Sequence, residues 1–385
     1  MAYEFQIPRK VIIGENALEL ARETVTGFGK KALIVTGKIV AASEMAARLT
    51  QCLDDWGIGW TIYAGITGEP TDTMIEEGTE CYRKNGCDFG IAIGGGSPLD
   101  AAKAILVMSV LPGAISDYAG KEIRGTFPPL AAIPTTAGTG SETTKFTIIT
   151  DTRRQVKLLL KGRDLLPDLA VIDPSFSVSA PPSVTAATGM DAFTHAAEAY
   201  TSRKGNALTD VYALSAVNRI FNWLPVAYRE PENKKAREEM AIAAFEAGVC
   251  INNASVTLVH GMSRPIGALF HVPHGISNAM LIRACLAYVL DGAPERFARL
   301  AVAMGCAGAA DPVPEAARKF LTGLEALCRA CEIPGVLEYG IGKAEFEAAM
   351  EKMAEDAMDS GSPENTIKEV TKQDLLAIYG QLIAG

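Results

Sequence analysis

The segment Phe89-Gly-Ile-Ala-Ile-Gly-Gly-Gly-Ser-Pro-Leu-Asp-Ala-Ala-Lys-Ala-Ile105 indicates how the first half of the chain folds. A short apolar run is followed by a glycine turn and then by an alanine-rich helical pattern. We expect Ser97 to cap this helix, with Pro98 in its first position and Asp100 three residues after the cap, as in a capping box. The segment therefore predicts a strand, a tight turn and a helix, in that order.

The glycine turn is also a candidate anion site. Its glycines permit backbone amides to approach a phosphate closely, and the helix N-terminus adds a partial positive charge. The turn is neither a P-loop nor the G-x-G-x-x-G of a standard Rossmann fold. A second loop, Pro134-Thr-Thr-Ala-Gly-Thr-Gly-Ser-Glu142, follows the apolar run Leu130 to Ile133. Since a tight strand-to-helix turn without a ligand is common, it is the two loops together that indicate a nucleotide site.

The same alternation of strands and helices extends over the whole first half. Such alternation predicts a mainly parallel sheet covered by helices. Long stretches of helical period dominate after Pro181-Pro182, and strand signals nearly vanish there. We therefore expect a nucleotide-binding α/β domain over residues 1–180 and an all-α domain over residues 181–385. The expected strands are Val11 to Ile13, Ala32 to Thr36, Trp60 to Tyr63, Phe89 to Ile93, Leu130 to Ile133 and Leu169 to Ile172.

Composition narrows the class of partner. The formal net charge is -9 and no run of Lys and Arg interrupts it, which argues against a nucleic-acid surface and favours small-molecule partners. The amino terminus lacks the apolar region of a signal peptide, and the longest apolar stretch is shorter than the ~20 residues that span a bilayer. Eight scattered cysteines suit a reducing compartment, so we expect a cytoplasmic protein without a membrane partner.

The histidines indicate a metal site. All four lie between His195 and His274, and Asp191 precedes His195 by one helical turn, so both side chains can face one ion. Two more imidazoles can come from the segment His260 to His274, where Pro265, Pro273 and glycines are expected to make turns. A buried, hydrogen-bonded histidine is the ordinary interpretation of His195 alone. An aspartate oxygen with neutral imidazoles suits iron, zinc or manganese.

Together, these four segments resemble the iron-containing, group III alcohol dehydrogenases, in order and over nearly the whole chain. The resemblance implies a dinucleotide-binding α/β domain, an all-α domain of the dehydroquinate synthase-like superfamily and an active site in the cleft between them. It implies hydride transfer between C4 of a nicotinamide and a small primary alcohol or aldehyde at the metal, by a homodimer or larger homo-oligomer.

The resemblance also implies roles for individual residues. The metal, usually Fe²⁺ with Zn²⁺ or Mn²⁺ as alternatives, would be held by Asp191, His195, His260 and His274. The cofactor, NAD or NADP, would be bound by Gly37, Gly94, Gly95, Gly96, Ser97, Asp100, Lys103, Thr135, Thr136, Thr139, Phe146 and Lys157.

The chain departs from the family's pattern in the coenzyme region. Many NAD-preferring members place an aspartate after the second strand, where its carboxylate accepts from the ribose hydroxyls. Here that strand ends in Thr36-Gly37-Lys38. Without the acid nothing repels a 2′-phosphate, and Lys38 can attract one, so NADP(H) is a second candidate coenzyme. Lys38 as a solvated loop residue is the competing interpretation.

Two candidate catalytic residues lie near the ligand segment. Arg264 stands where lactaldehyde reductase-like members have a histidine. Its guanidinium cannot relay protons but can bind a carboxylate, phosphate or sulfonate, which predicts a substrate with an anionic group. Pairing of Arg264 with a local acid or with the cofactor phosphate is the alternative. His271 is a candidate proton relay, with packing or orientation of the metal site as the alternative role.

Two other functions compete with this hypothesis. One is a zinc-dependent polyol dehydrogenase of the glycerol dehydrogenase type, or a dehydroquinate synthase-like lyase, of the same superfamily; the Asp-His-His-His set favours the iron group. The other is a non-catalytic protein that binds a nucleotide or a metal, although both the ligand set and the glycine loop are complete in this chain.

Overall fold

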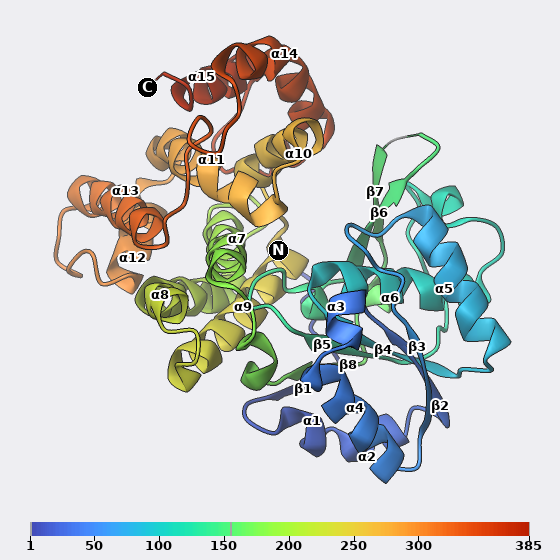
Figure 1. Ribbon diagram of the computed structural model, residues 1–385. Coiled ribbons are helices and arrows are strands. Elements are labelled where there is room, and N and C mark those ends of the chain that lie inside the picture. The colour runs from blue at the N-terminus through green and yellow to red at the C-terminus, as the bar shows by residue number, and fades with distance from the viewer. Residues whose placement is uncertain (1, 155, 385) are drawn as a thin grey trace. The chain divides into compact units, whose positions relative to one another are not determined.

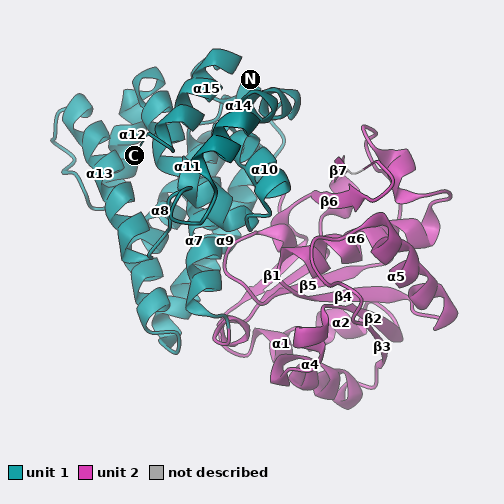
Figure 2. Ribbon diagram, turned by 45° about the horizontal axis from the view of Figure 1, so that its top comes forward, with its two compact units in different colours: residues 1–5, 180–385 teal, residues 6–179 magenta. Residues whose placement is uncertain are grey.

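The chain forms two compact units in the computed structural model, which describes residues 2–154 and 156–384 (Figures 1 and 2). The α/β unit comprises Gln6–Ser179. The helical unit comprises Ala180–Gly385 together with Met1–Phe5, and the ring of Phe5 stacks on Tyr212 within it.

The α/β unit is built on a six-stranded, wholly parallel sheet, which confirms the expected fold class. Every residue of its strand β4 is buried, because helices cover both faces of a parallel sheet. All six strands expected from the sequence are present. In their order across the sheet they are β1 (Lys10–Ile13), β8 (Leu169–Ile172), β5 (Leu130–Pro134), β4 (Phe89–Gly94), β2 (Lys31–Val35) and β3 (Gly59–Tyr63).

Successive side chains of a strand point to opposite faces, so the sheet has two cores. On one face Ile34 packs with Leu18 and Leu49 of the first helices, and on the other Leu33 packs with Ile75 and Ile105. The helices of this unit are α1 (Ala17–Leu20), α2 (Arg22–Thr26), α3 (Lys38–Ala41), α4 (Glu44–Asp55), α5 (Asp72–Lys84) and α6 (Gly96–Val110).

Helix α6 begins two residues earlier than the sequence predicted. Gly95 takes the N-cap position and no side chain caps the helix, so the expected cap at Ser97 is wrong. Gly94, at φ 152°, turns the chain within a single residue, which brings Ser97 into the first helical turn. The first amides of α6 therefore have no side-chain acceptor and remain available to an anion.

A two-stranded antiparallel hairpin was missed by the sequence analysis. It consists of β6 (Phe146–Asp151) and β7 (Val156–Lys161). Its residues Ile149 and Leu160 belong to the same hydrophobic core as the buried residues of α6. Alternate residues of β6 are buried, which is the period-2 pattern of a strand with one face in a core.

The helical unit contains no strand among its described residues, as expected. Its central helix α7 is buried along most of its length and packs against α8, α9 and α11. Pro265 was expected in a turn and instead lies inside α10, which continues because its apolar face is buried. The helices are α7 (Pro182–Tyr200), α8 (Ala207–Arg229), α9 (Lys234–Ala254), α10 (Leu258–Phe270), α11 (His274–Val289), α12 (Pro294–Ala303), α13 (Val313–Ala330), α14 (Lys343–Asp359) and α15 (Lys372–Gln381).

No single described helix is long and apolar enough to cross a membrane. Helices α9 and α10 pass that test only as a pair, and a bend of 103° separates them.

Candidate metal and nucleotide sites

Three helices bring the four predicted metal ligands together. Helix α7 carries Asp191 and His195 on one face, α10 carries His260, and α11 begins at His274. Oδ1 of Asp191 lies 3.6 Å from Nε2 of His195, 3.6 Å from Nε2 of His260 and 3.7 Å from Nε2 of His274. One aspartate oxygen therefore faces three imidazole nitrogens.

These distances fit a shared divalent cation. Nitrogen and oxygen ligands bind such an ion at about 2.0–2.2 Å, so neighbouring donors in octahedral or tetrahedral geometry lie about 2.8–3.6 Å apart. Donor atoms of Asp191, His195 and His260 all lie within 4.8 Å of one another, and these three side chains are buried. The side chain of His274 is 43% exposed, so the cluster is open on that side.

Glu198 supports this cluster and was missed by the sequence analysis. It lies on α7 one turn after His195, is fully buried, and its Oε2 is 2.5 Å from Nδ1 of His260. A carboxylate at Nδ1 holds the proton there and leaves Nε2 of His260 free to bind a metal. The sequence could have identified Glu198 as a candidate, because its spacing from Asp191 and His195 places all three on one helical face.

The charges of the cluster stabilise one another. Burial disfavours ionisation of Asp191, but the imidazoles of His195, His274 and His260 outweigh it and hold the pKa of Asp191 well below its usual range. Burial likewise disfavours charge on His260, but Glu198 and Asp191 raise its pKa to about 9. The site is thus organised around two carboxylates that remain ionised.

Close helix packing fixes the start of α11. A Cβ atom at Gly275 would lie 2.3 Å from the carbonyl oxygen of Ala187, so only glycine permits α11 to approach the backbone of α7 this closely. The neighbouring His274 is thereby held beside Asp191.

The two candidate catalytic residues have different surroundings. His271 ends α10 in a left-handed conformation (φ 53°) and is exposed. Arg264 lies one turn after His260, and its Nη1 donates to Oγ of Ser362 at 2.9 Å. Burial lowers the pKa of Arg264, although Glu198 opposes this. Within residues 2–154 and 156–384 no carboxylate forms an ion pair with Arg264.

The two predicted nucleotide loops lie side by side in the α/β unit. They follow the paired strands β4 and β5, and the amide of Thr135 donates to the carbonyl of Gly94 at 2.9 Å. A Cβ atom at Gly96 would lie 3.0 Å from Cγ2 of Thr139, so the loops are in close contact. Both leave the carboxyl edge of the sheet, where ligands of open α/β sheets bind.

Asp100 is partly buried and Lys103 is buried beside these loops. Nζ of Lys103 lies 3.2 Å from Oγ of Ser141, 3.0 Å from the carbonyl of Thr144 and 2.9 Å from the carbonyl of Phe146. Asp100 accepts from the hydroxyl of Ser141 and from the amide of Ile148. Burial raises the pKa of Asp100 and lowers that of Lys103. Both charged groups thus tie α6 to the second loop.

The other three predicted cofactor residues lie elsewhere in the same unit. Phe146 begins β6, and its carbonyl accepts from Lys103. Gly37 precedes α3, and a Cβ atom there would lie 2.8 Å from the carbonyl oxygen of Ile66, so the backbone is closely packed. Lys157 lies on β7, where its Nζ pairs with Oε1 of Glu69 at 2.7 Å.

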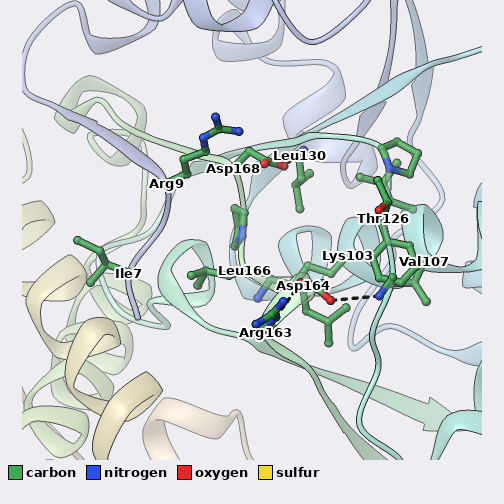
Figure 3. Close-up of a pocket in the computed structure, with 16 residues that line it drawn as sticks. Ile7, Arg9, Lys103, Val107, Thr126, Leu130, Arg163, Asp164, Leu166 and Asp168 are labelled. Carbon is green, nitrogen blue, oxygen red and sulfur yellow. Dashed lines mark hydrogen bonds and ion pairs between the residues drawn. The ribbon is translucent and has the colours of Figure 1, made fainter. Parts of the chain in front are cut away.

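A cavity of about 370 Å³ in the α/β unit lies away from both loops (Figure 3). Arg9, Leu130 and Asp168 line it near the amino ends of β1, β5 and β8, whereas the glycine turn follows a carboxyl end. Of the predicted cofactor residues only Lys103 lines this cavity, and its ammonium group is already bound by residues 141–146. The cavity is therefore separate from the predicted nucleotide site.

Comparison with known proteins covers both units. Residues 8–174 match the family model of iron-containing alcohol dehydrogenases, and residues 185–383 match the C-terminal model of the Fe-containing alcohol dehydrogenase family. The chain is 35% identical to a 1,3-propanediol dehydrogenase of Klebsiella pneumoniae over 384 residues, which is 98% of each protein.

Solved structures are similar over the same extent. A crystal structure of a 1,3-propanediol oxidoreductase matches with a TM-score of 0.96 and 34% identity, over 99% of this chain and 100% of that one. Sulfoacetaldehyde reductase from Bifidobacterium kashiwanohense in complex with NAD⁺ matches with a TM-score of 0.90 and 26% identity, over 100% of this chain and 99% of that one.

The contact between Glu198 and His260 generates the first prediction. We expect Glu198→Gln to weaken binding of a divalent cation by about 10–100-fold, because an amide no longer fixes the Nδ1 proton of His260. Glu246→Gln is the matched control, since Glu246 is also buried and bonds to Ser215 on another helix. Competition with a chromogenic chelator measures the affinity. Equal affinities of the two variants would contradict the role of Glu198.

Proposed function

Because the chain belongs to the iron-containing alcohol dehydrogenase family, we propose that it interconverts a small primary alcohol and its aldehyde with NAD(P). The convergence of three imidazoles on Oδ1 of Asp191 is the observation that carries this proposal. The family models describe iron-containing alcohol dehydrogenases, and a donor set of this kind suits iron.

Asp191, His195, His260 and His274 would hold the cation, and the donor set suits iron first, with zinc and manganese as alternatives. When bound, the cation acts as a Lewis acid that favours deprotonation of an alcohol and polarises a carbonyl, while the nicotinamide exchanges hydride. The single carboxylate of Asp191 neutralises only part of a divalent charge, which leaves the cation electrophilic. Glu198 orients His260, and the proton-relay role of His271 stays a prediction.

The glycine turn would bind the pyrophosphate of the coenzyme. Its amides at the start of α6 have no side-chain cap, and the helix dipole favours an anion there. The hydroxyl-rich loop beside it, with Thr135, Thr136 and Thr139, offers further donors. Asp100 and Lys103 act by holding these loops together, since their charged groups are bound by protein atoms.

We also propose that NADPH is accepted. Strand β2 is followed by Gly37 and the exposed Lys38, and close packing against Ile66 leaves no room for a larger side chain at Gly37. A lysine at the end of this strand attracts a ribose 2′-phosphate, whereas a carboxylate would repel it.

Arg264 supports a substrate with an anionic group. It is a partly buried cation near the predicted metal ligand His260, its guanidinium donates to the neutral hydroxyl of Ser362, and it forms no ion pair in the described part of the chain. A partly buried charge without an ionic partner is unfavourable, and a carboxylate or sulfonate on the substrate would compensate it. The similarity to sulfoacetaldehyde reductase agrees with this class of substrate.

Metal dependence tests the proposed function directly. We expect the iron-reconstituted protein to oxidise NADH or NADPH in the presence of short aldehydes, as followed by nicotinamide absorbance. Asp191→Ala should lower this activity at least ~100-fold, because the cation loses its only anionic ligand. Asp359→Ala, an exposed substitution on α14, should leave it unchanged. Absence of hydride transfer with both coenzymes over a broad panel of aldehydes would overturn the proposal.

Coenzyme preference tests the role of Lys38. Lys38→Glu should lower the ratio of kcat/KM for NADPH to that for NADH by about 10-fold, which corresponds to ~1.4 kcal/mol of lost attraction. Lys30→Glu, at another exposed position of the α/β unit, serves as the control for net charge. An unchanged ratio would show that Lys38 does not contact the coenzyme.

Substrate charge tests the role of Arg264. We expect Arg264→Ala to lower kcat/KM about 100-fold for sulfoacetaldehyde and succinic semialdehyde, because a charge-assisted hydrogen bond contributes ~1.5–3 kcal/mol. The loss for propanal and butanal should stay below about threefold. Equal losses on charged and neutral aldehydes would eliminate recognition of an anionic group by Arg264.

A further inference from the structure

We propose that Asn278 is a positioning residue of the metal centre, which holds the Asp191 carboxylate and thereby strengthens cation binding. This inference rests on the proposed metal-dependent function. Asn278 lies on α11, four residues after His274, so the two side chains share one face of the helix.

The side-chain nitrogen of Asn278 contacts three of the four expected ligand atoms. Nδ2 donates to Oδ1 of Asp191 at 2.8 Å and lies 3.2 Å from Nε2 of both His260 and His274. The amide therefore touches residues of all three helices that form the cluster.

The contact with Asp191 is the one compatible with a bound cation. Each imidazole has a single lone pair at Nε2, which cannot serve the amide and a metal at the same time. A carboxylate has about four acceptor positions, so Asp191 can accept from Asn278 and bind a cation together. The amide thus fixes the orientation of the carboxylate and lowers the conformational cost of placing it on the ion.

Asn278 has no other evident reason to be polar. The residue is fully buried, and its Oδ1 has no hydrogen-bond partner among the described residues. A buried unsatisfied carbonyl costs about 1–3 kcal/mol of stability. Folding alone would therefore favour an apolar side chain of similar size at this position, and the contact with Asp191 accounts for the amide.

The absence of charge on the Asn278 side chain also suits a positioning role. A neutral amide can donate to Asp191 without adding a positive charge next to the cation site, as lysine or arginine would. The side chain is short and packed into α11, so little conformational freedom is lost in making the bond.

Two substitutions at Asn278 and one control test the inference. Asn278→Leu keeps the volume and removes the donor, whereas Asn278→Ala removes both. Ser277→Ala is the matched control, because Ser277 is equally buried on α11 and its hydroxyl bonds to the carbonyl of His274 within the same helix. The full chain is used, and binding of Zn²⁺ and Co²⁺ is measured by chelator competition.

We expect both Asn278 variants to bind Zn²⁺ and Co²⁺ about 10–100-fold more weakly than the native protein, as for other groups that orient a ligand. The control should differ by less than about threefold. The thermal unfolding temperature of the metal-free Asn278→Leu protein should change little, because removal of the unsatisfied Oδ1 offsets loss of the bond to Asp191. A merely structural role would instead lower the unfolding temperature and the affinity together.

A double-mutant cycle with Asp191→Asn tests the route of the effect. If Asn278 acts through the Asp191 carboxylate, Asn278→Leu should weaken Co²⁺ binding less than about threefold in the Asp191→Asn background. A full loss in that background would overturn the inference.

The remaining outcomes separate this inference from the proposed function. Native affinity in Asn278→Leu, with or without a loss in Asn278→Ala, would overturn the positioning role and leave the metal centre in place. No cation binding by the native protein would overturn the metal centre and this inference with it.

Discussion

The site in the helical unit depends on one buried carboxylate, that of Glu198. Its Oε1 accepts from the hydroxyl of Thr257 at 2.8 Å and from the amide of Val259 at 2.6 Å, while its Oε2 faces His260. Glu198 therefore caps the N-terminus of α10 and orients the predicted metal ligand His260 with the same group. Since an anion at a helix N-terminus is stabilised by the helix dipole, the carboxylate remains ionised in the core.

Helix α7 is the element from which the site is built. It carries Asp191, His195 and Glu198 on one face and is buried almost throughout. Burying two carboxylates in one helix is unfavourable unless partners compensate them. The imidazoles and the cap of α10 supply this compensation, which lowers the pKa of Asp191 and that of Glu198 despite their burial. Fold and site thus depend on the same set of contacts.

The sequence alone predicted the elements that follow a periodic pattern and the site residues that stand at a recognisable spacing. The six strands were found because each is a short apolar run bounded by turns, and Asp191 and His195 because their spacing places them on one helical face. The cap at Ser97 was predicted wrongly, since three successive glycines allow several entry points to a helix and side-chain preference alone does not choose among them. The hairpin was missed because four of the six residues of β7 are exposed, among them two lysines.

The supporting residues of the site escaped detection for another reason. Glu198 and Asn278 are single polar residues within otherwise ordinary helices, and their partners lie 62 and 87 residues away along the chain. Helical spacing places Glu198 on the face of Asp191 and His195, but no local pattern shows that it contacts His260 or that Asn278 contacts Asp191. Arg264 was recognised by its position after His260, but its burial and its bond to Ser362 depend on the fold.

The buried ammonium of Lys103 has a mechanical consequence for the α/β unit. Its hydrogen-bond acceptors lie within residues 141–146, whereas the lysine itself and Asp100, with which it forms an ion pair, belong to the helix that starts at the glycine turn. Separating the two loops would strip a charged group of all these bonds in a medium where water cannot replace them. We therefore expect the two loops to keep a constant spacing, so that a dinucleotide bound there, as proposed, would find a preformed site.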